Sequence, residues 1–220
     1  MYLNIFKETL KGKSLNRILQ NIEMSKVKIN GDVIDLGSKS IKSPYYEYIT
    51  KTPDTNITFT DLNPTNDGVL KIDLEKPLPI KTATKDYVIL SNVLEHLFNH
   101  NSCITESYRI LKKDGQLIGF SPFLYHFHPD PNDYFRYTHS ALKKLFKQAG
   151  FSDIKIKPLG FGPVSTGVSQ FAVIAKFKPL IACIYIASVL IDKLLNKIFK
   201  NNETIKPSNF ALTYFFVCKK

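Results

Sequence analysis

Short apolar, β-branched runs alternate with helical segments along most of the chain, a pattern typical of βαβ units around a parallel sheet. The predicted strands are residues 32–36, 57–61, 69–72, 87–91, 116–120, 154–157 and 210–218, with helices between them. The segment that ends in Asp114-Gly115 carries apolar residues at helical spacing and predicts a helix, a tight turn and the next strand. A later helix is expected to begin after the cap Thr138 and to end at Gly150.

Residues 161–207 break this rhythm between the sixth and seventh predicted strands. A connection of this length is too long for a plain loop, so we expect a helical insertion within a single domain that covers residues 1–220. Its longest uncharged run is 179–191, and crossing a bilayer takes about 20 residues. The run therefore predicts a buried or interfacial helix, and segment 179–200 could make a peripheral membrane contact.

Composition narrows the class of protein. Hydrophobic residues make up 44% of the 220 residues and charged residues 22%, which predicts a folded chain. The net charge of +11 favours an anionic partner, but the lysines are scattered over helix faces and turns, and no separate basic domain indicates a nucleic-acid protein. The three cysteines lack metal-binding or disulfide spacing, and the first residues carry Lys7 and Glu8 rather than a signal-peptide core. We expect a cytoplasmic protein, and nothing in the pattern indicates an oligomeric state.

Polar residues follow four successive predicted strands. Asp35 and Gly37 follow the first, Asp61 ends the second, and Asp73 and Asn92 follow the third and fourth. Each alone is explained by a turn, a cap or a surface position. In a doubly wound sheet, however, ligands bind at the carboxyl ends of strands where the strand order reverses. The ordered set therefore predicts one shared site.

From about residue 32 to 151 the chain resembles the class I S-adenosylmethionine-dependent methyltransferases, in particular the bacterial type 11 domain group. The resemblance is carried by "VIDLGS", "FTDLNP", "KIDLEKPLPI" and the long stretch "DYVILSNVLEHLFNHNSCITESYRILKKDGQLIGFSPF". The segment "FHPDPNDYFRYTHSALKKLFKQAGF" is similar to a subgroup often associated with surface polysaccharide biosynthesis. The resemblance implies an α/β, Rossmann-like fold: a doubly wound, mostly parallel seven-stranded sheet with helices on both faces and an antiparallel last strand.

The resemblance also implies the cofactor S-adenosyl-L-methionine and methyl transfer to a small-molecule or saccharide acceptor, including a lipid-linked one. Asp35 and Gly37 would lie by the methionine part, Asp61 by the ribose hydroxyls, Asp73 by the adenine edge and Asn92 by the sulfonium. The full implied cofactor set is Asp35, Gly37, Ser38, Lys39, Asp61, Leu62, Asp73, Leu74 and Asn92.

The first motif departs from the family pattern Asp-x-Gly-x-Gly-x-Gly, because Lys39 and Ile41 occupy the second and third glycine positions. Lys39 could pair with the methionine carboxylate, or its side chain could fill the cofactor's space. Two alternatives to a small-molecule methyltransferase therefore stay open: a catalytically silent binding or scaffold protein, and, from the net charge, a nucleic-acid methyltransferase.

After the fifth strand, four residues match the subgroup's pattern and are the candidate catalytic residues: His128, Asp133, Tyr134 and Arg136. His128 is the candidate general base, since an imidazole titrates near neutral pH. An equally supported interpretation is that Asp133 and Arg136 form an ion pair that holds a loop. Glu95-His96 is interpreted as fixing the turn after the fourth strand, and no metal ligands are predicted.

Overall fold

The computed structural model describes residues 1–39, 43–172, 174–200 and 202–220. The chain divides into two compact units, each built from segments distant in sequence. The first consists of Met1–Glu23, Phe123–His126 and Pro158–Tyr214, and the second of Met24–Pro122, Phe127–Lys157 and Phe215–Lys220. The prediction of a single domain stays a prediction.

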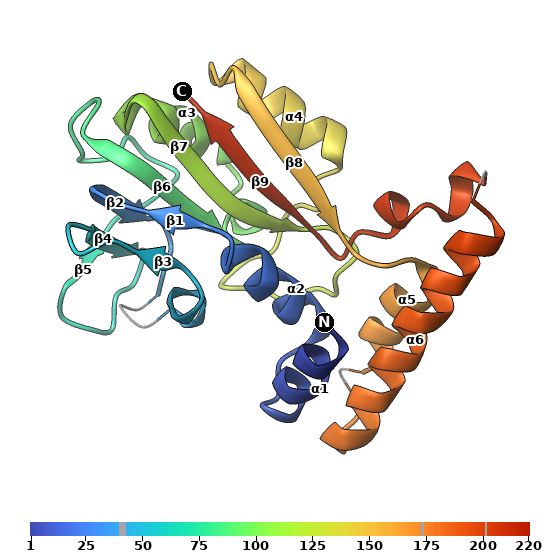
Figure 1. The fold of residues 1–220 in the computed structure, drawn as a ribbon. Helices are drawn as coiled ribbons and strands as arrows, with labels where there is room; N and C mark the ends of the chain where they lie inside the picture. Colours follow the sequence, from blue (N-terminus) through green and yellow to red (C-terminus); the bar gives the residue numbers. More distant parts are fainter. Residues whose placement is uncertain (40–42, 173, 201) are drawn as a thin grey trace. The chain divides into compact units, whose positions relative to one another are not determined.

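A seven-stranded sheet forms the centre of the second unit (Figure 1). Its strands are β2 (Asp32–Asp35), β4 (Asn56–Asp61), β5 (Val69–Lys71), β6 (Lys85–Ser91), β7 (Leu111–Pro122), β8 (Asp153–Leu159) and β9 (Thr213–Lys219). Their order is β5-β4-β2-β6-β7-β9-β8, and β2 pairs in parallel with both β4 and β6. The sheet is mixed and mostly parallel, with an antiparallel strand near the C-terminus, so the predicted fold class is confirmed.

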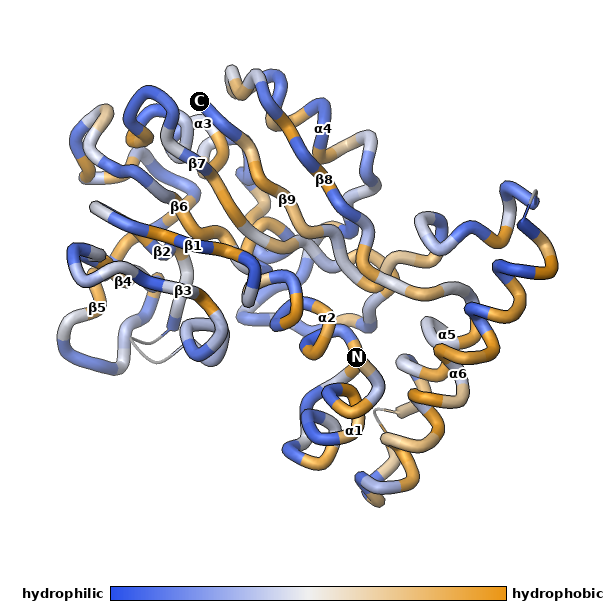
Figure 2. The backbone as a smooth tube through the Cα atoms, viewed as in Figure 1, coloured by the Kyte–Doolittle hydropathy of each residue, from blue (hydrophilic) through white to orange (hydrophobic). Residues whose placement is uncertain are grey.

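The central strands form because their side chains are apolar on both faces. Val33 and Ile34 of β2 and residues 88–90 of β6 are fully buried, as expected for parallel strands covered on both sides. Figure 2 shows hydrophobic colour along parts of β6 and β7. A second, two-stranded parallel sheet pairs β1 (Lys28–Ile29) with β3 (Thr50–Lys51) and was not predicted.

Two helices, α3 (His100–Ile110) and α4 (His139–Gln148), lie on one side of the seven-stranded sheet (Figure 1). The predicted cap of α4 is confirmed, because Thr138 Oγ1 accepts a hydrogen bond from the Ala141 N–H at 3.2 Å. Phe146 of α4 is fully buried, and its ring centroid lies 4.8 Å from that of Phe216 on β9. This pair fixes α4 to the sheet.

The turn predicted at Asp114-Gly115 is wrong in position. Helix α3 ends at Ile110 and β7 begins directly at Leu111, before the Asp-Gly pair. Lys85 pairs with Leu111 and Tyr87 pairs with Gln116, so residues 112–115 bulge out of the strand. Asp114 adopts φ +66° there. The Asp-Gly pair does indicate a left-handed backbone conformation. In this chain that conformation occurs in a bulge within β7 rather than in a turn before the strand.

The first unit is helical, as predicted for the insertion at 161–207. It contains α1 (Tyr2–Leu10), α2 (Leu15–Met24), α5 (Pro163–Phe171), α6 (Lys178–Ile198) and the 3-10 helices η3 (Glu203–Ile205) and η4 (Pro207–Phe210). Helices α1 and α5 both pack on α6. Helix α5 has no side-chain cap of its own, and Asp192 of α6 accepts hydrogen bonds from the Val164 and Ser165 N–H groups at 2.9 and 2.8 Å. A fully buried carboxylate therefore joins the two helices.

Helix α6 extends beyond the uncharged run at both ends and reaches 21 residues. Within the described part of the chain it alone is long and apolar enough to cross a membrane, although those two properties do not separate a membrane span from a surface or core helix. Only 28% of its most apolar 18-residue window is buried. Figure 2 shows hydrophobic residues along most of its length. The exposed ones are Leu180, Ile184, Leu190, Ile191, Leu194 and Ile198.

Candidate functional site

The polar residues predicted to share a site lie at the carboxyl ends of four neighbouring strands. In the order β5-β4-β2-β6 these strands lead into Asp73, Asp61, Asp35 and Asn92. Backbone pairing continues just past the strands, because the Leu36 N–H donates to the Ile89 carbonyl and the Ile72 N–H to the Asp61 carbonyl, both at 2.9 Å. The strand order reverses between β2 and β6, which is where doubly wound folds bind ligands. The structure thus brings the predicted set to one edge.

The loop after β2 is fixed by Gly37 and by a residue that the sequence analysis missed, Thr60. Gly37 adopts φ +76°, and a Cβ atom at this position would lie 2.9 Å from Val93 Cγ2. Its N–H donates to Thr60 Oγ1 at 3.3 Å, and that hydroxyl donates to the Asp35 carbonyl at 3.0 Å. The Ser38 N–H donates to the Thr60 carbonyl at 2.9 Å. Thr60 is fully buried, and its only sequence signal is its place directly before Asp61.

The Asp35 carboxyl group is buried beneath two tyrosines. Its Oδ2 accepts hydrogen bonds from the hydroxyls of Tyr45 and Tyr46, the second at 2.9 Å. Burial raises the pKa of Asp35 to about 7, and the two hydrogen bonds offset part of that rise. Its Oδ1 has no hydrogen-bond partner among the residues that the structure describes. Both tyrosines come from the 3-10 helix η1 (Pro44–Glu47), and only the aromatic cluster "PYYEY" in the sequence could have indicated them.

Asp61 and Lys39 lie side by side. The two oxygens of the Asp61 carboxylate accept hydrogen bonds from the N–H groups of Lys39, at 3.1 Å, and Asn63, at 2.8 Å. Lys39 adopts φ +58°, and its ammonium pairs with Asp130 in the loop after β7. The Lys39 side chain is 67% exposed, so it does not fill the space between the strand ends. Ile41, the other departure from the glycine pattern, lies outside the described residues.

Asp73 has local partners of its own. It accepts a hydrogen bond from the Glu75 N–H at 3.0 Å and pairs with Lys76 at 3.1 Å, and these interactions lower its pKa. Leu74, which follows it, is buried, whereas Leu62 after Asp61 is 44% exposed. Of the two leucines predicted to contact the cofactor, Leu74 is therefore shielded from solvent and Leu62 is open to it.

Asn92 is held in a backbone conformation that few residues other than glycine adopt. Its φ is +55°, and its N–H donates to the Phe120 carbonyl at 2.9 Å. Its side-chain amide lies 3.4 Å from Ser91 Oγ. This geometry ends β6 sharply and leads into the 3-10 helix η2 (Leu94–His96).

The candidate catalytic residues lie in the loop 127–137 after β7. Arg136 makes a two-pronged ion pair with Asp133, with Nη2 to Oδ2 at 2.6 Å, and this lowers the pKa of Asp133 to about 2. The same carboxylate accepts the His128 N–H at 2.8 Å. The interpretation that an Asp133–Arg136 pair holds a loop is therefore confirmed. The catalytic roles of these residues and of Tyr134, which is 45% exposed, stay predictions.

This loop is anchored to η2, directly after Asn92. The Tyr134 N–H donates to the Glu95 carbonyl at 2.7 Å, and the Tyr137 hydroxyl donates to the Leu94 carbonyl at 3.1 Å. His96 Nδ1 lies 2.6 Å from the Asn132 carbonyl. These bonds place the candidate catalytic residues on the segment that continues from the strand-end set.

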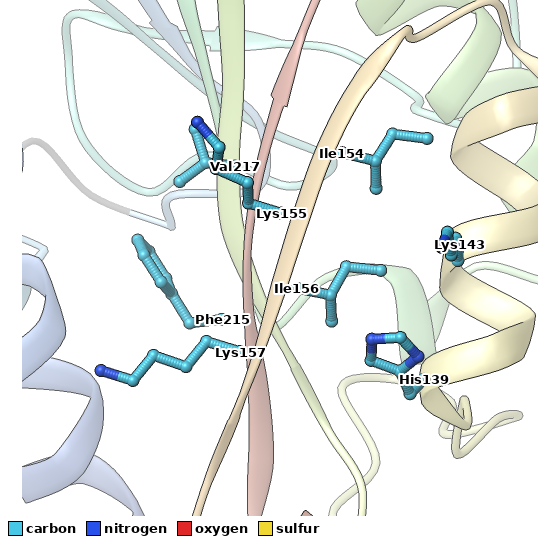
Figure 3. Close-up of a pocket in the computed structure, with 8 residues that line it drawn as sticks. All are labelled: His139, Lys143, Ile154, Lys155, Ile156, Lys157, Phe215 and Val217. Atoms are coloured by element: carbon cyan, nitrogen blue, oxygen red, sulfur yellow. The ribbon is translucent and has the colours of Figure 1, made fainter.

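An open hollow of about 500 Å³ lies elsewhere in the second unit (Figure 3). It is lined by His139, Lys143, Ile154, Lys155, Ile156, Lys157, Phe215 and Val217. Figure 3 shows Ile154 and Ile156 on the side of β8 that faces α4, with Lys155 and Lys157 on the other. None of the predicted site residues lines it, so it is not the candidate site.

Comparisons with known proteins agree with this fold. Residues 46–119 match the type 11 family model described as a methyltransferase domain. No curated protein sequence matches the chain. Among solved structures, an S-adenosylmethionine-dependent methyltransferase from Archaeoglobus fulgidus has a TM-score of 0.54 at 20% identity, covering 93% of this chain and 91% of that one.

Two further structures give the same fold. Phosphoethanolamine N-methyltransferase 2 from Haemonchus contortus, in complex with S-adenosyl-L-methionine, has a TM-score of 0.56 at 15% identity over 91% of this chain. This chain spans about half of that protein, 52% of its length. A Thermotoga maritima protein described as a possible histamine N-methyltransferase has a TM-score of 0.53 at 16% identity, covering 100% of this chain and 89% of that one. At these identities the likeness is one of fold.

Proposed function

We propose that the chain is an S-adenosylmethionine-dependent methyltransferase, as its matched segment and its fold support, and that its acceptor is a small molecule or a saccharide, including a lipid-linked one. The observation that carries the proposal is the convergence of Asp35, Asp61, Asp73 and Asn92 at the ends of four neighbouring strands. The cofactor, when bound, supplies a methyl group already activated on a positively charged sulfonium. The protein then has to bind the cofactor, orient the acceptor toward its methyl group and exclude water.

The residues at the strand ends fit this cofactor. Each oxygen of the Asp61 carboxylate accepts one backbone hydrogen bond and retains capacity for one ribose hydroxyl. The buried Oδ1 of Asp35 can accept a hydrogen bond from the cationic amino group of the methionine part. Gly37 lets the loop after β2 pack closely against Val93 and so holds this loop beside the strand ends. Because this cofactor carries no phosphate, a full glycine-rich loop is unnecessary, and Lys39 in place of a second glycine is compatible with binding.

On the acceptor side, we assign His128 to the acceptor hydroxyl as a general base. Its side chain is 29% exposed and therefore reachable from solvent. The Asp133–Arg136 pair holds the loop that carries it, through the hydrogen bond from the His128 N–H to Asp133. A general base removes the proton of an acceptor hydroxyl and so makes its oxygen a better nucleophile, whereas the methyl donor needs no base.

Calorimetric titration with S-adenosyl-L-methionine tests the proposal. We expect Asp61→Ala to weaken binding by about 2 kcal/mol, roughly thirtyfold, because two hydroxyl hydrogen bonds are lost. Asp153→Ala, an exposed aspartate on β8, is the matched control and should bind as the wild type does. A hundredfold excess of cofactor over its dissociation constant should also stabilise the fold by ~2.7 kcal/mol. Folded protein that gives neither heat nor a thermal shift would instead support the silent binding protein.

A lipid-linked acceptor would bring the chain to a membrane, and one observation favours this. Helix α6 exposes a row of large apolar side chains, with Leu194 at 56% and Ile198 at 62%, and Lys197 and Lys200 lie at the same end. Such a helix suits the interface of an anionic membrane, with apolar side chains in the acyl region and ammonium groups at the lipid phosphates. We therefore assign α6 to the surface of an anionic membrane on the cytoplasmic side.

Vesicle flotation distinguishes this assignment from a surface helix without a lipid partner. We expect flotation with phosphatidylglycerol vesicles, little with pure phosphatidylcholine vesicles, and a several-fold loss in Leu194→Glu and Ile198→Glu. Leu70→Glu is the control, since Leu70 is 48% exposed on β5 in the other unit. Equal behaviour of the α6 variants and the control, or no flotation of the wild type, would contradict the assignment.

A further inference from the structure

A buried carboxylate faces two imidazoles directly after the strand-end site. The Glu95 side chain is fully buried, and its Oε1 lies 3.8 Å from His96 Nε2 and 3.7 Å from His128 Nε2. Neither of its carboxylate oxygens has a hydrogen-bond partner within the described ranges of the chain. A buried carboxylate without a hydrogen bond is costly unless it is neutralised or binds a cation. Among the described residues, the two imidazoles are therefore the groups placed to neutralise Glu95, either as imidazolium ions or by holding a cation together with it.

The ring of His96 is oriented for such a partner. Its Nδ1 lies 2.6 Å from the Asn132 carbonyl oxygen, which can only accept a hydrogen bond. The proton therefore belongs on Nδ1, and the lone pair of Nε2 is directed toward Glu95. A backbone carbonyl behind an imidazole is the usual device that fixes the tautomer of a metal ligand.

His128 is held in a similar way by Asp133. Its Nδ1 lies 3.3 Å from Asp133 Oδ2 and 3.2 Å from Arg136 Nη2. Arg136 Nη2 can only donate and makes a hydrogen bond to Nδ1, so without an ion the proton lies on Nε2 and faces Glu95 across 3.7 Å, beyond hydrogen-bond length. An ion bound at Nε2 displaces this proton, and the metal-binding form of the ring carries its proton on Nδ1, directed at Asp133. The Asp133–His128 contact then has the form of a carboxylate–histidine pair behind a metal.

The donor atoms of Glu95, His96 and His128 all lie within 4.8 Å of one another. Bonds of about 2.1 Å to a common ion place neighbouring ligand atoms roughly 3.0–3.4 Å apart. The two gaps between carboxylate and imidazole therefore need to close by about 0.5 Å, a movement that side-chain rotation can provide.

We propose that Glu95, His96 and His128 bind one divalent metal ion. Two imidazoles and one carboxylate favour borderline ions such as Zn²⁺, Fe²⁺ and Mn²⁺ over Mg²⁺ and Ca²⁺, which prefer oxygen ligands. The proposal departs from the prediction that the chain has no metal ligands. That prediction relied on cysteine spacing, whereas His128 lies far along the chain from Glu95-His96 and reaches them only through the fold of the loop 127–137.

Three protein ligands leave coordination positions open, and the site follows Asn92 by three residues. Resting on the proposed function, we assign an open position to an acceptor oxygen, so that the ion lowers the pKa of the acceptor hydroxyl. The hydroxyl proton then passes to solvent, the oxygen takes the methyl group, and the electron pair of the broken C–S bond stays on sulfur. In this arrangement His128 holds the ion, and the ion replaces it as the group that activates the acceptor.

Zinc titration of the full chain against a chromophoric chelator tests the site. A Cys183→Ser background removes an exposed thiol that would compete for zinc. We expect one equivalent to bind, with at least a tenfold loss of affinity in Glu95→Gln and in His128→Gln. Asp133→Asn should weaken binding by roughly tenfold, as outer partners of metal-ligating histidines do. The control is His139→Gln, the same substitution on an exposed histidine of α4, and it should bind as the parent does.

Two results would overturn the site: folded parent protein that binds no zinc, or variants of Glu95 and His128 that bind it as tightly as the control. If a variant does not fold, cobalt substitution of the parent decides instead, because ligation by two histidines gives paramagnetically shifted imidazole N–H signals and their absence refutes the site. Cofactor titration in the presence of a chelator separates the two proposals. Cofactor binding that persists without metal leaves the proposed function intact even if the metal site fails.

Discussion

At the level of single residues, the Asp35 carboxyl couples stability to pH. Its folded-state pKa of about 7 lies well above the unperturbed value of 3.8, so the folded chain holds this proton through a pH range in which the unfolded chain has lost it. The contribution is fully present below about pH 4 and is lost as the pH rises through about 7. At about 1.4 kcal/mol per pKa unit, the loss is on the order of 4 kcal/mol.

We expect Asp35→Asn to remove this dependence. Urea unfolding at pH 4.5 and 7.5 should show the unfolding free energy of the wild type falling, relative to the variant, by a few kcal/mol between the two values. The difference between the two proteins is the quantity to follow, because Asp73 and Asp133, whose pKa values are lowered, titrate identically in both. Parallel pH profiles would show that Asp35 ionises in the folded state as an ordinary carboxylate does.

Gly37 gives a second prediction at this scale. Alanine here must adopt φ +76° and place its Cβ 2.9 Å from Val93 Cγ2, whereas alanine at Gly68 meets the same backbone penalty, at φ +84°, with nothing within 4 Å. Gly68→Ala should cost about 1 kcal/mol, and Gly37→Ala about 2–3 kcal/mol together with weaker cofactor binding. Thermal unfolding of both variants checks the first part and calorimetry the second. Equal costs would mean that Val93 moves aside freely.

At the level of elements, α5 depends on another helix for its cap. Asp192 of α6 accepts two N–H groups at the start of α5, and a Cβ on Gly162 would lie 2.6 Å from Asp192 Oδ1. We expect Asp192→Ala to lower the unfolding free energy by about 2 kcal/mol, since one buried and one part-buried N–H group lose their acceptor. Asp67→Ala, an exposed aspartate, is the control for denaturant unfolding. A cost no larger than the control's would mean that water caps α5 equally well.

Some of the strands could be predicted from the sequence and others could not. The strands β2, β4 and β6 follow from short β-branched and apolar runs, and the polar residues after them follow from the place of ligands in such sheets. The two-residue strands β1 and β3 are too short for a hydrophobic period, and the bulge in β7 uses the same Asp-Gly signal as a turn.

The residues that hold the site's side chains in place could not be predicted from the sequence, for a different reason. Tyr45 reaches Asp35 across 10 positions, Thr60 reaches it across 25, and His128 meets Glu95 only after the loop 127–137 has folded. Sequence patterns record which face of an element is apolar, whereas these contacts depend on how a loop closes on a neighbouring strand. The residues that bind a ligand directly were therefore easier to predict than the residues that hold them.

At the level of the whole molecule, the charge of +11 raises the question of a nucleic-acid acceptor. Part of the lysine charge is neutralised locally, as in the pairs of Lys112 with Asp86 and Lys219 with Asp114. Lys155, which pairs with Asp153 at 3.2 Å, lies with Lys143 and Lys157 around the open hollow of the second unit, apart from the strand ends. An anionic polymer would therefore be attracted by scattered charge rather than by a charged groove that leads to the cofactor site.

This distribution predicts weak and salt-sensitive binding to polyanions. We expect the protein to leave a heparin column below about 0.3 M salt, because few phosphates or sulfates are contacted at once. The double variant Lys143→Ser, Lys157→Ser should elute earlier still, whereas its cofactor affinity stays unchanged, since neither residue touches the strand-end site. Retention that survives 0.5 M salt, together with crosslinking to RNA through the loop 127–137, would reverse the preference and make a nucleic acid the acceptor.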